Sequence, residues 1–162
     1  MGLFDKLAKK FSSATTVYAP IPGEVISLKD IADGVFSEGI LGQGVGIKPK
    51  VGLVYAPFDG KVVQIADTKH AICIQNSAGV QLMIHVGLDT VNMQGNGFEQ
   101  QVQLGDTVTG GQQIMTFSMD EIKKAGYPTT AVVVILNSNE YSSIEIIGNG
   151  EVTKADKLIQ VS

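Results

Sequence analysis

Two histidines, His70 and His85, are the side chains of this chain best suited to chemistry near neutral pH, and they are its whole histidine content. They begin and end the segment HAICIQNSAGVQLMIH, in which two runs of β-forming residues flank a turn cluster at 76–79. This pattern predicts a β-hairpin. A loop of two or four residues would place His70 opposite His85, with Cβ atoms about 4.5–5.5 Å apart. A three-residue loop would shift the register and separate the two rings.

The two faces of the predicted hairpin differ in character. Side chains alternate along a strand, so Leu82 and Ile84 lie on one face, and Met83 and His85 lie on the other. We expect the first face to be core and the second to be a shallow apolar surface within reach of solvent or a partner. The single cysteine, Cys73, would face Leu82 and act as a small buried hydrophobe. One cysteine excludes an internal disulfide and any multi-cysteine metal site.

Three kinds of chemistry suit a pair of facing histidines. Zinc would need a third ligand, which Asp89 could supply four residues after His85. Acid–base catalysis would need a substrate pocket, and the sequence shows no clear residues for one. A phosphoryl acceptor needs one open ring nitrogen, a second nitrogen held as a donor, and hydrogen bonds to the phosphate oxygens. His85 could meet these needs with His70, Thr68 and the backbone after Gly87, because phosphoryl transfer depends mostly on positioning and charge stabilisation.

Composition excludes several classes of protein. The net charge is -4, the pI is about 5.1, and all 12 basic residues are lysines. Nucleic-acid binding is disfavoured, since there is neither a basic field nor an arginine to read guanine. No apolar run is long enough to cross a bilayer, and no secretory signal with a cleavable apolar core is present. We therefore expect a soluble protein of the cytoplasm.

The N-terminal segment, residues 1–16, reads as an amphipathic tail followed by a small polar linker. In MGLFDKLAKKF the apolar residues at positions 3, 4, 7 and 11 have helical spacing, and three lysines lie on the other side. A basic amphipathic segment on an acidic body is a candidate for peripheral contact with the inner face of the membrane through residues 1–11. A frayed terminus explains the same residues equally well.

Residues 17–162 read as a single all-β domain, an antiparallel β-sandwich or flattened barrel. Many short strands are separated by glycines, of which the chain has 19. The segments YAPIPGEVISL from Tyr18 and YAPFDGKVVQI from Tyr55 resemble each other, which suggests a duplicated strand-turn-strand unit. One short accessory helix is predicted, with Ser118 as its cap, Glu121 completing a capping box and Gly126 at its end.

The glycine-rich loop DIADGVFSEGILGQGVGI, at 30–47, connects the two copies of this unit. Its glycine spacing gives neither G-x-G-x-x-G nor a phosphate loop, so we reject a nucleotide site here. Phe36, Ile40 and Leu41 are large apolar residues in an otherwise polar loop. They would either form an exposed docking surface or tuck under the loop as a small satellite core.

The segment GVQLMIHVGLDTV at 79–91 closely resembles the phosphohistidine signature of the glucose-family enzyme IIA of the bacterial phosphoenolpyruvate:sugar phosphotransferase system. The resemblance extends to most of the chain beyond the tail. It includes Ala19-Pro20 with Gly23, the loop 33–46, Ala56-Pro57 to Gly60, Thr68 with His70, the segment 95–99, and Gly105-Asp106-Thr107-Val108. The family fold is an antiparallel β-sandwich or flattened barrel, in agreement with the strand pattern.

The resemblance implies a role for each residue of the histidine site. His85 would accept a phosphoryl group through Nε2 from the histidine phosphocarrier protein and pass it to the cysteine of a sugar-permease IIB domain. His70 would donate a hydrogen bond to the phosphate, and Thr68 would orient His70. The carbonyl oxygen of Gly87 would hold the Nδ1–H of His85. No cofactor is implied as a requirement, although some relatives bind zinc between the two histidines and a partner carboxylate.

The resemblance also implies a surface for the protein partners, which include regulatory targets in some relatives. Its apolar residues would be Phe36, Ile40, Leu41, Leu88 and Val91, with Asp33 and Asp89 as a polar fringe. The amphipathic tail suggests a stand-alone protein rather than a domain fused to a permease. A phosphocarrier is thus the favoured function. The alternative from another class is a zinc-dependent hydrolase that uses His70, His85 and Asp89.

Overall fold

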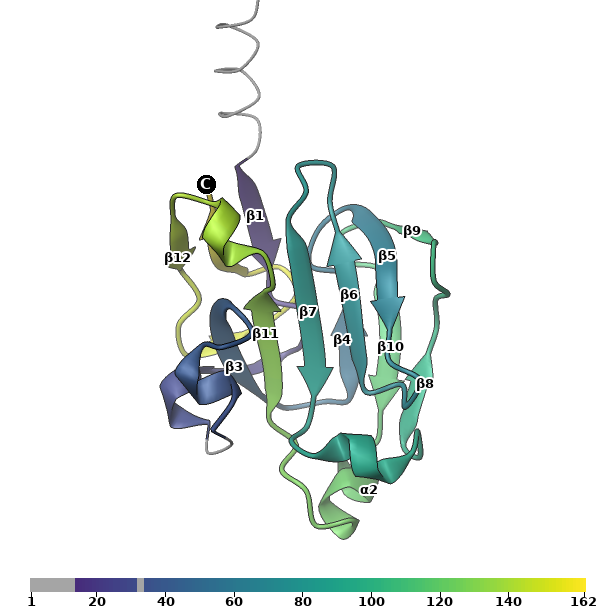
Figure 1. Ribbon diagram of the computed structural model, residues 1–162. Coiled ribbons are helices and arrows are strands. Elements are labelled where there is room, and N and C mark those ends of the chain that lie inside the picture. The colour runs from purple at the N-terminus through teal and green to yellow at the C-terminus, as the bar shows by residue number, and fades with distance from the viewer. Residues whose placement is uncertain (1–13, 32–33) are drawn as a thin grey trace, which may run out of the picture.

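The computed structural model describes residues 14–31 and 34–162 of the 162-residue chain. Its strands form three antiparallel sheets that enclose one main core as a β-sandwich (Figure 1). The strands of the largest sheet are, in spatial order, β13 (Glu151–Val152), β2 (Gly23–Ser27), β3 (Gln43–Pro49), β11 (Ala131–Ile135), β7 (Gln81–Val86), β6 (Ala71–Gln75), β5 (Gly60–Ile65) and β9 (Thr107–Val108). The predicted all-β architecture is confirmed.

Two smaller sheets complete the sandwich. One contains β1 (Thr15–Tyr18), β14 (Lys157–Val161) and β12 (Ile144–Ile146), and the other contains β4 (Leu53–Tyr55), β10 (Gln113–Phe117) and β8 (Phe98–Gln100). Four short 3-10 turns connect strands: η1 (Leu28–Asp30), η2 (Phe36–Glu38), η3 (Thr90–Met93) and η4 (Ser138–Glu140). The first strand begins at Thr15, so residues 15 and 16 belong to β1 rather than to the linker that we expected.

The accessory helix α2 (Met119–Lys124) begins where the sequence predicts. The Ser118 hydroxyl accepts a hydrogen bond from the backbone N–H of Glu121 at 3.2 Å, which satisfies one of the free amides of the first turn. After Ala125, Gly126 has a φ of +90°, a left-handed conformation that ends the helix. No helix in the described part of the chain is long and apolar enough to span a bilayer. The predicted amphipathic tail lies outside the described residues.

The repeated sequence unit corresponds to a repeated structure. Tyr18 ends β1 and Tyr55 ends β4, and each is followed by a turn and by a strand that starts with glycine. The two copies also bind each other, because the Tyr18 N–H donates to the Pro57 carbonyl at 3.0 Å and the Tyr55 N–H donates to the Pro20 carbonyl at 2.7 Å. This reciprocal pairing confirms the duplicated strand-turn-strand unit and joins the two halves of the sandwich.

The central strand β11 is buried on both faces, in agreement with its continuous apolar sequence. Val133 and Ile135 point into the main core, and Val132 and Val134 point into a second, smaller apolar cluster on the opposite face of the large sheet. The buried members of this second cluster are Leu28, Ile31, Phe36, Leu88, Val132 and Val134. Val132 pairs with His85 across the ladder, so the second cluster lies next to His85 on the same face of the large sheet.

Candidate functional site

The hairpin of β6 and β7 forms as predicted, but its register is the shifted one that we expected for an odd-numbered loop, not the one that a loop of two or four residues would give. Ala71, not His70, is the ladder partner of His85, and Gln75 pairs with Gln81. The loop between the strands has five residues, because the Asn76 side-chain oxygen accepts hydrogen bonds from the N–H groups of Ala78 at 3.1 Å and Val80 at 2.9 Å. These side-chain bonds stabilise a longer loop than the two or four residues that direct pairing would need.

The two imidazole rings are nevertheless in contact. Their centroids lie 4.7 Å apart and their planes are nearly perpendicular, at 87°. His70 precedes the first residue of β6, and its carbonyl accepts the Val86 N–H at 2.8 Å. Lys69, just before it, has a φ of +63°, so the chain turns sharply and the His70 side chain no longer follows the alternation of the strand. Our expectation that a shifted register would separate the rings is therefore wrong.

The shifted register changes the face of the hairpin on which Cys73 lies. Ile72 lies in the main core, whereas Cys73 pairs with Met83 on the face that carries His85. Cys73 is still buried, as predicted, with 4% of its surface exposed. Burial raises the pKa of its thiol to about 11, so the nucleophilic thiolate is scarce at neutral pH. The placement of Cys73 on the core face was wrong, but its reading as an inert hydrophobe agrees with this environment.

His70 is enclosed by its neighbours and has only 6% of its surface exposed. Its Nδ1 lies 2.7 Å from the Thr68 hydroxyl, and its ring centroid lies 6.3 Å from that of Phe98 on β8. Burial lowers the pKa of His70 below its usual range, and a backbone hydrogen bond at Thr68 opposes this shift. The net direction favours a neutral imidazole at physiological pH. The Thr68 hydroxyl thus lies within hydrogen-bond distance of the His70 ring.

His85 is more accessible than His70, being half-buried. The ring of Phe36, on η2, lies 5.1 Å from the His85 ring at an interplanar angle of 57°. Phe36 itself is buried in the second apolar cluster, with 8% of its surface exposed. The loop that carries it therefore packs over β7 and β11 and forms one wall of the histidine site.

The backbone turns tightly after His85. Gly87 has a φ of +78°, and a Cβ at this position would come within 2.3 Å of the Thr90 side-chain methyl group. Thr90 is fully buried and its hydroxyl donates to the Val86 carbonyl at 2.6 Å. The Leu88 N–H donates to the Pro128 carbonyl at 3.2 Å. These contacts need glycine at 87, and they hold the peptide groups next to His85 in one conformation.

Backbone strain is concentrated around the histidine pair. Among the described residues, the non-glycine residues with positive φ are Lys69, Asp89 and Gln94. Lys69 directly precedes His70, Asp89 follows His85 by four residues, and Gln94 ends η3. Such conformations are costly for residues with a Cβ and occur often at functional sites.

The residues expected to bind partners divide into two groups. Ile40, Leu41 and Val91 are exposed, with 66%, 40% and 50% of their surface accessible. Phe36 and Leu88, in contrast, are buried in the second cluster, so the loop provides both an exposed apolar surface and a satellite core. Among the polar residues expected at the fringe, Asp89 is exposed and Asp33 lies outside the described residues.

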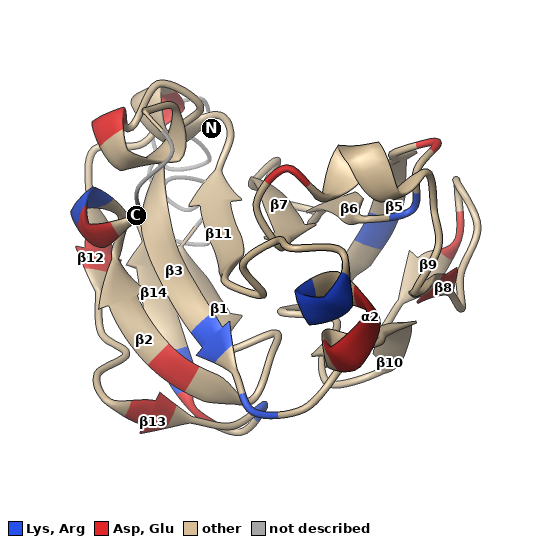
Figure 2. Cartoon of the chain, turned by 90° about the horizontal axis from the view of Figure 1, so that it is seen from below, with Lys and Arg blue, Asp and Glu red and all other residues tan. Residues whose placement is uncertain are grey.

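The strands β7 and β11 carry no charged side chains, whereas Lys69 and Asp89 lie in the loops that adjoin the two histidines. Figure 2, a view from below, shows β7 and β11 in tan along their length, with charged residues on α2 and on outer strands such as β2 and β13. In the described part of the chain, no group of three His, Cys, Asp or Glu side chains could hold a metal ion. The set of His70, His85 and Asp89 required by the hydrolase alternative is therefore not assembled there as a metal site.

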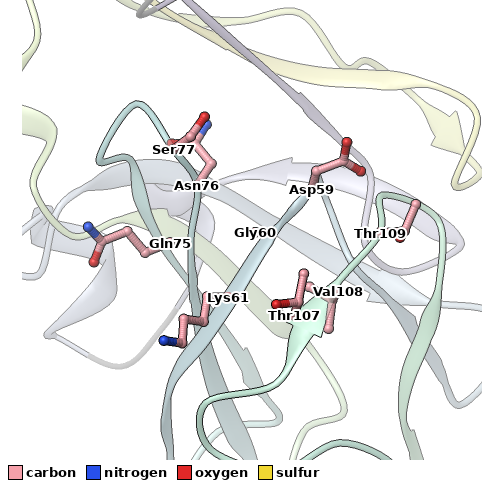
Figure 3. A pocket seen from close by; sticks show the side chains of 9 residues that line it. All are labelled: Asp59, Gly60, Lys61, Gln75, Asn76, Ser77, Thr107, Val108 and Thr109. Carbon is pink, nitrogen blue, oxygen red and sulfur yellow. The ribbon is translucent and has the colours of Figure 1, made fainter.

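One cavity of small-molecule size has no histidine in its lining. A cavity of about 480 Å³ is located beside the hairpin loop, between β5, β6 and β9, and is lined by Asp59, Lys61, Gln75 and Thr107 among others (Figure 3). The cavity next to Cys73 and Met83, on the histidine face, holds only about 60 Å³. Small-molecule sites usually have roughly 300–1,000 Å³. The histidine face is thus better suited to a protein partner than to an enclosed small substrate.

Two contacts of the site could not be predicted from the chemistry of single residues. Phe98 lies on β8, in a different sheet, and reaches His70 only through the packing of the sandwich. Gln100, on the same strand, donates from Nε2 to the Lys69 carbonyl at 3.0 Å. The one sequence signal was their place within or next to the segment 95–99 that takes part in the family resemblance.

The β-sandwich fold agrees with the class of protein that the sequence resembles. The sequence profile of the phosphoenolpyruvate-dependent sugar phosphotransferase system EIIA 1 family matches residues 15–141. The chain belongs to this family.

Relatives of two kinds resemble the chain. It is 36% identical over 154 residues to the glucose-specific EIIA component of Oceanobacillus iheyensis, covering 95% of this chain and 93% of that protein. It is also 43% identical over 145 residues to the glucose-specific EIICBA component of Staphylococcus carnosus, where the match covers 90% of this chain and 21% of the relative. The chain thus spans only about a fifth of the length of such multidomain relatives.

A solved structure shows the same fold. The glucose permease IIA of Mycoplasma capricolum superposes with a TM-score of 0.83 at 35% sequence identity. The superposition covers 91% of this chain and 95% of that protein.

Proposed function

We propose that His85 accepts a phosphoryl group from the histidine phosphocarrier protein and passes it to the cysteine of a sugar-permease IIB domain. The observation that carries this proposal is the 4.7 Å contact between the two rings, with His70 buried and fixed by Thr68 while His85 is half-buried at the surface. One ring is thus positioned to support and the other to react. Because the chain belongs to the phosphotransferase-system family, this asymmetry supports phosphoryl transfer as the chemistry of the pair.

Each transfer exchanges one bond to phosphorus for another. In the first step, the P–N bond of the phosphocarrier's phosphohistidine breaks and a P–N bond forms at His85 Nε2. In the second step, the IIB cysteine thiolate attacks phosphorus and His85 departs as a neutral imidazole, provided that Nδ1 has kept its proton. The carbonyl oxygen of Gly87 would accept that Nδ1–H, and the rigid turn from Gly87 to Thr90 supports such a role.

His70 is proposed to stabilise the phosphate on His85. If the Thr68 hydroxyl donates to Nδ1 at 2.7 Å, a neutral His70 carries its proton on Nε2 and can donate it to a phosphate oxygen. The lowered pKa of His70 favours this neutral form. A donor that is already oriented loses little entropy when the phosphate arrives. No step in this scheme requires a metal ion or another cofactor.

The exposed apolar residues Ile40, Leu41 and Val91 are proposed to contact both protein partners, with Phe36 and Leu88 beneath them. Asp33 and Asp89 would lie at the edge of this surface. A shallow apolar surface with few charges can bind successive partners, because it makes no demand for one particular arrangement of countercharges. Regulatory proteins could use the same surface.

A labelling experiment tests the central claim. With phosphoenolpyruvate, enzyme I and the phosphocarrier, the protein should take up phosphate that is labile to acid and stable to base. The variant His85→Ala should take up none, and Gln81→Ala, on the same strand and face, should be labelled like the wild type. Uptake by His85→Ala would show that the acceptor is another residue.

We further propose that the protein acts in the cytoplasm, in peripheral contact with the inner membrane face through residues 1–11. The sequence pattern of that segment supports the proposal, since three lysines oppose its apolar residues. Flotation with liposomes should recover the protein better with anionic than with neutral lipid. Equal recovery after deletion of residues 1–11 would contradict membrane contact.

A further inference from the structure

The loop that carries Thr68 and His70 is fastened at several points. Within the loop, the Lys69 N–H donates to the Ala66 carbonyl at 2.8 Å, and the Ala66 N–H donates to the Ala71 carbonyl at 3.0 Å. From outside, the Lys69 carbonyl accepts a hydrogen bond from Gln100 Nε2 at 3.0 Å. Lys69 is thus held through both its N–H and its carbonyl, and the carbonyl belongs to the peptide group that leads directly into His70.

Lys69 needs such support because its φ of +63° is unfavourable for a residue with a Cβ. Without the bond from Gln100, the peptide between Lys69 and His70 could rotate towards a more common conformation. That rotation would move the His70 ring away from the Thr68 hydroxyl, which now lies 2.7 Å from Nδ1.

Gln100 reaches the loop from the strand that also supports the His70 ring. Residues 98 and 100 are two apart on β8, so their side chains point to the same side. The Phe98 ring lies 6.3 Å from the His70 ring. The Gln100 amide donates a hydrogen bond to the carbonyl of Lys69, the residue before His70. Strand β8 therefore contacts both the side chain of His70 and the backbone next to it.

We propose that Gln100 is a positioning residue for phosphoryl transfer, which holds Lys69 in its left-handed conformation and so aligns His70 with the phosphate on His85. This inference rests on the proposed function of the histidine pair. Gln100 itself does not touch the phosphate. Its effect passes through the Lys69 carbonyl to His70.

A purely stabilising role explains Gln100 less well. Its Oε1 atom is buried and has no hydrogen-bond partner among the described residues, and a buried unsatisfied acceptor destabilises a fold. The other contact of Nε2 is the weak acceptor Sδ of Met115 at 3.0 Å. A methionine at position 100 would remove the unsatisfied oxygen together with the donor. The loss of the bond to Lys69 should therefore affect His70 more than it affects global stability.

The test compares Gln100→Met with the control Gln101→Met, whose amide pairs with Gln113 and not with the loop. Because the chain has two histidines, a spectrum of protein labelled with ¹⁵N-histidine contains the signals of only two imidazole rings. For Gln100→Met we expect altered ¹⁵N shifts and an altered titration of His70, with urea unfolding unchanged or shifted to higher urea. Transfer from phosphorylated His85 to a IIB domain should slow about tenfold, because a misplaced donor stabilises the transferring phosphoryl group less well.

Two further variants separate the loss of the hydrogen bond to Lys69 from other effects of the Gln100→Met substitution. Gln100→Glu keeps the shape of the side chain but replaces the donor by oxygen, so it should displace His70 as well. Lys69→Gly combined with Gln100→Met should recover part of the transfer rate, since glycine adopts positive φ without strain. Unchanged His70 signals in both Gln100 variants, or slowed transfer with unchanged signals, would overturn the proposal. If the wild type takes up no phosphate, the proposed function fails, and the His70 signals still decide whether Gln100 positions that ring.

Discussion

His70 and His85 are not partners in the β-ladder, yet their rings lie edge to face with centroids 4.7 Å apart. Lys69, which directly precedes His70, has a left-handed conformation, so the chain turns sharply just before strand β6. The two histidines therefore have unlike environments. His70 is buried and bonded to Thr68, whereas His85 lies half-buried on the second apolar cluster beneath the glycine-rich loop.

This asymmetry predicts different outcomes for substitution of each ring. His70→Gln should still accept phosphate from the phosphocarrier, because the acceptor nitrogen of His85 is untouched. Transfer onward to a IIB domain should slow by about 100-fold, since loss of an oriented donor weakens stabilisation of the transferring group. Rapid-quench measurement of the two half-reactions would separate them. Complete loss of acceptance would show that His70 is needed for the first step too.

The buried His70 should also make folding stability depend on pH. In the native state, burial lowers the pKa of His70 below its ordinary value of 6.5. Just below pH 6.5, the unfolded chain therefore binds a proton that the native chain does not bind. The free energy of unfolding should therefore fall as the pH decreases through 6.5 towards the native pKa, and it should be insensitive to His70 above that range. Urea titrations between pH 5 and 8 should show a smaller slope for His70→Gln than for the wild type. Equal slopes would contradict this prediction.

The tight turn after His85 should not tolerate a side chain at Gly87. In Gly87→Ala the new Cβ would come within 2.3 Å of the Thr90 methyl group and 3.1 Å of the Pro128 carbonyl oxygen, at a φ of +78°. We expect a loss of about 2–4 kcal/mol in the free energy of unfolding, from backbone strain and overpacking together. Gly105→Ala is the matched control, because Gly105 has a φ of +92° but no atom within 4 Å of the new Cβ.

Gly105→Ala should lose only the part of the free energy of unfolding that comes from backbone strain, about 1 kcal/mol. Equal losses in the two variants, measured by urea unfolding, would show that the contact with Thr90 is unimportant.

The exposed apolar residues near the site should matter for partners and not for stability. Ile40→Ser removes an apolar side chain that is 66% exposed, so the free energy of unfolding should change by less than about 0.5 kcal/mol. The KM for the phosphorylated phosphocarrier should rise about 5- to 30-fold, equivalent to 1–2 kcal/mol of lost contact. Leu104→Ser is the control, since Leu104 is 67% exposed and lies in the connection between β8 and β9. A similar rise in KM for both variants would argue against a defined docking surface.

Several features follow from the sequence alone because they depend on local chemistry. Alternating and continuous apolar runs specify strands such as β7 and β11, and Ser118 with Glu121 specifies the start of α2. The signature around His85 is likewise a property of consecutive residues. These patterns determine the all-β architecture, the hairpin and the two histidines as the candidate site.

The arrangement of the site depends on contacts that the tertiary structure alone provides. Asn76 closes a five-residue loop and thereby shifts the ladder register, and the left-handed Lys69 then restores the ring contact that this shift would have removed. Phe98 and Gln100 reach His70 and its loop from another sheet, because the packing of the sandwich brings β8 beside them. The sequence by itself determined which side chains are the candidates for the reaction. Side-chain bonds in loops and long-range packing decided how those side chains meet.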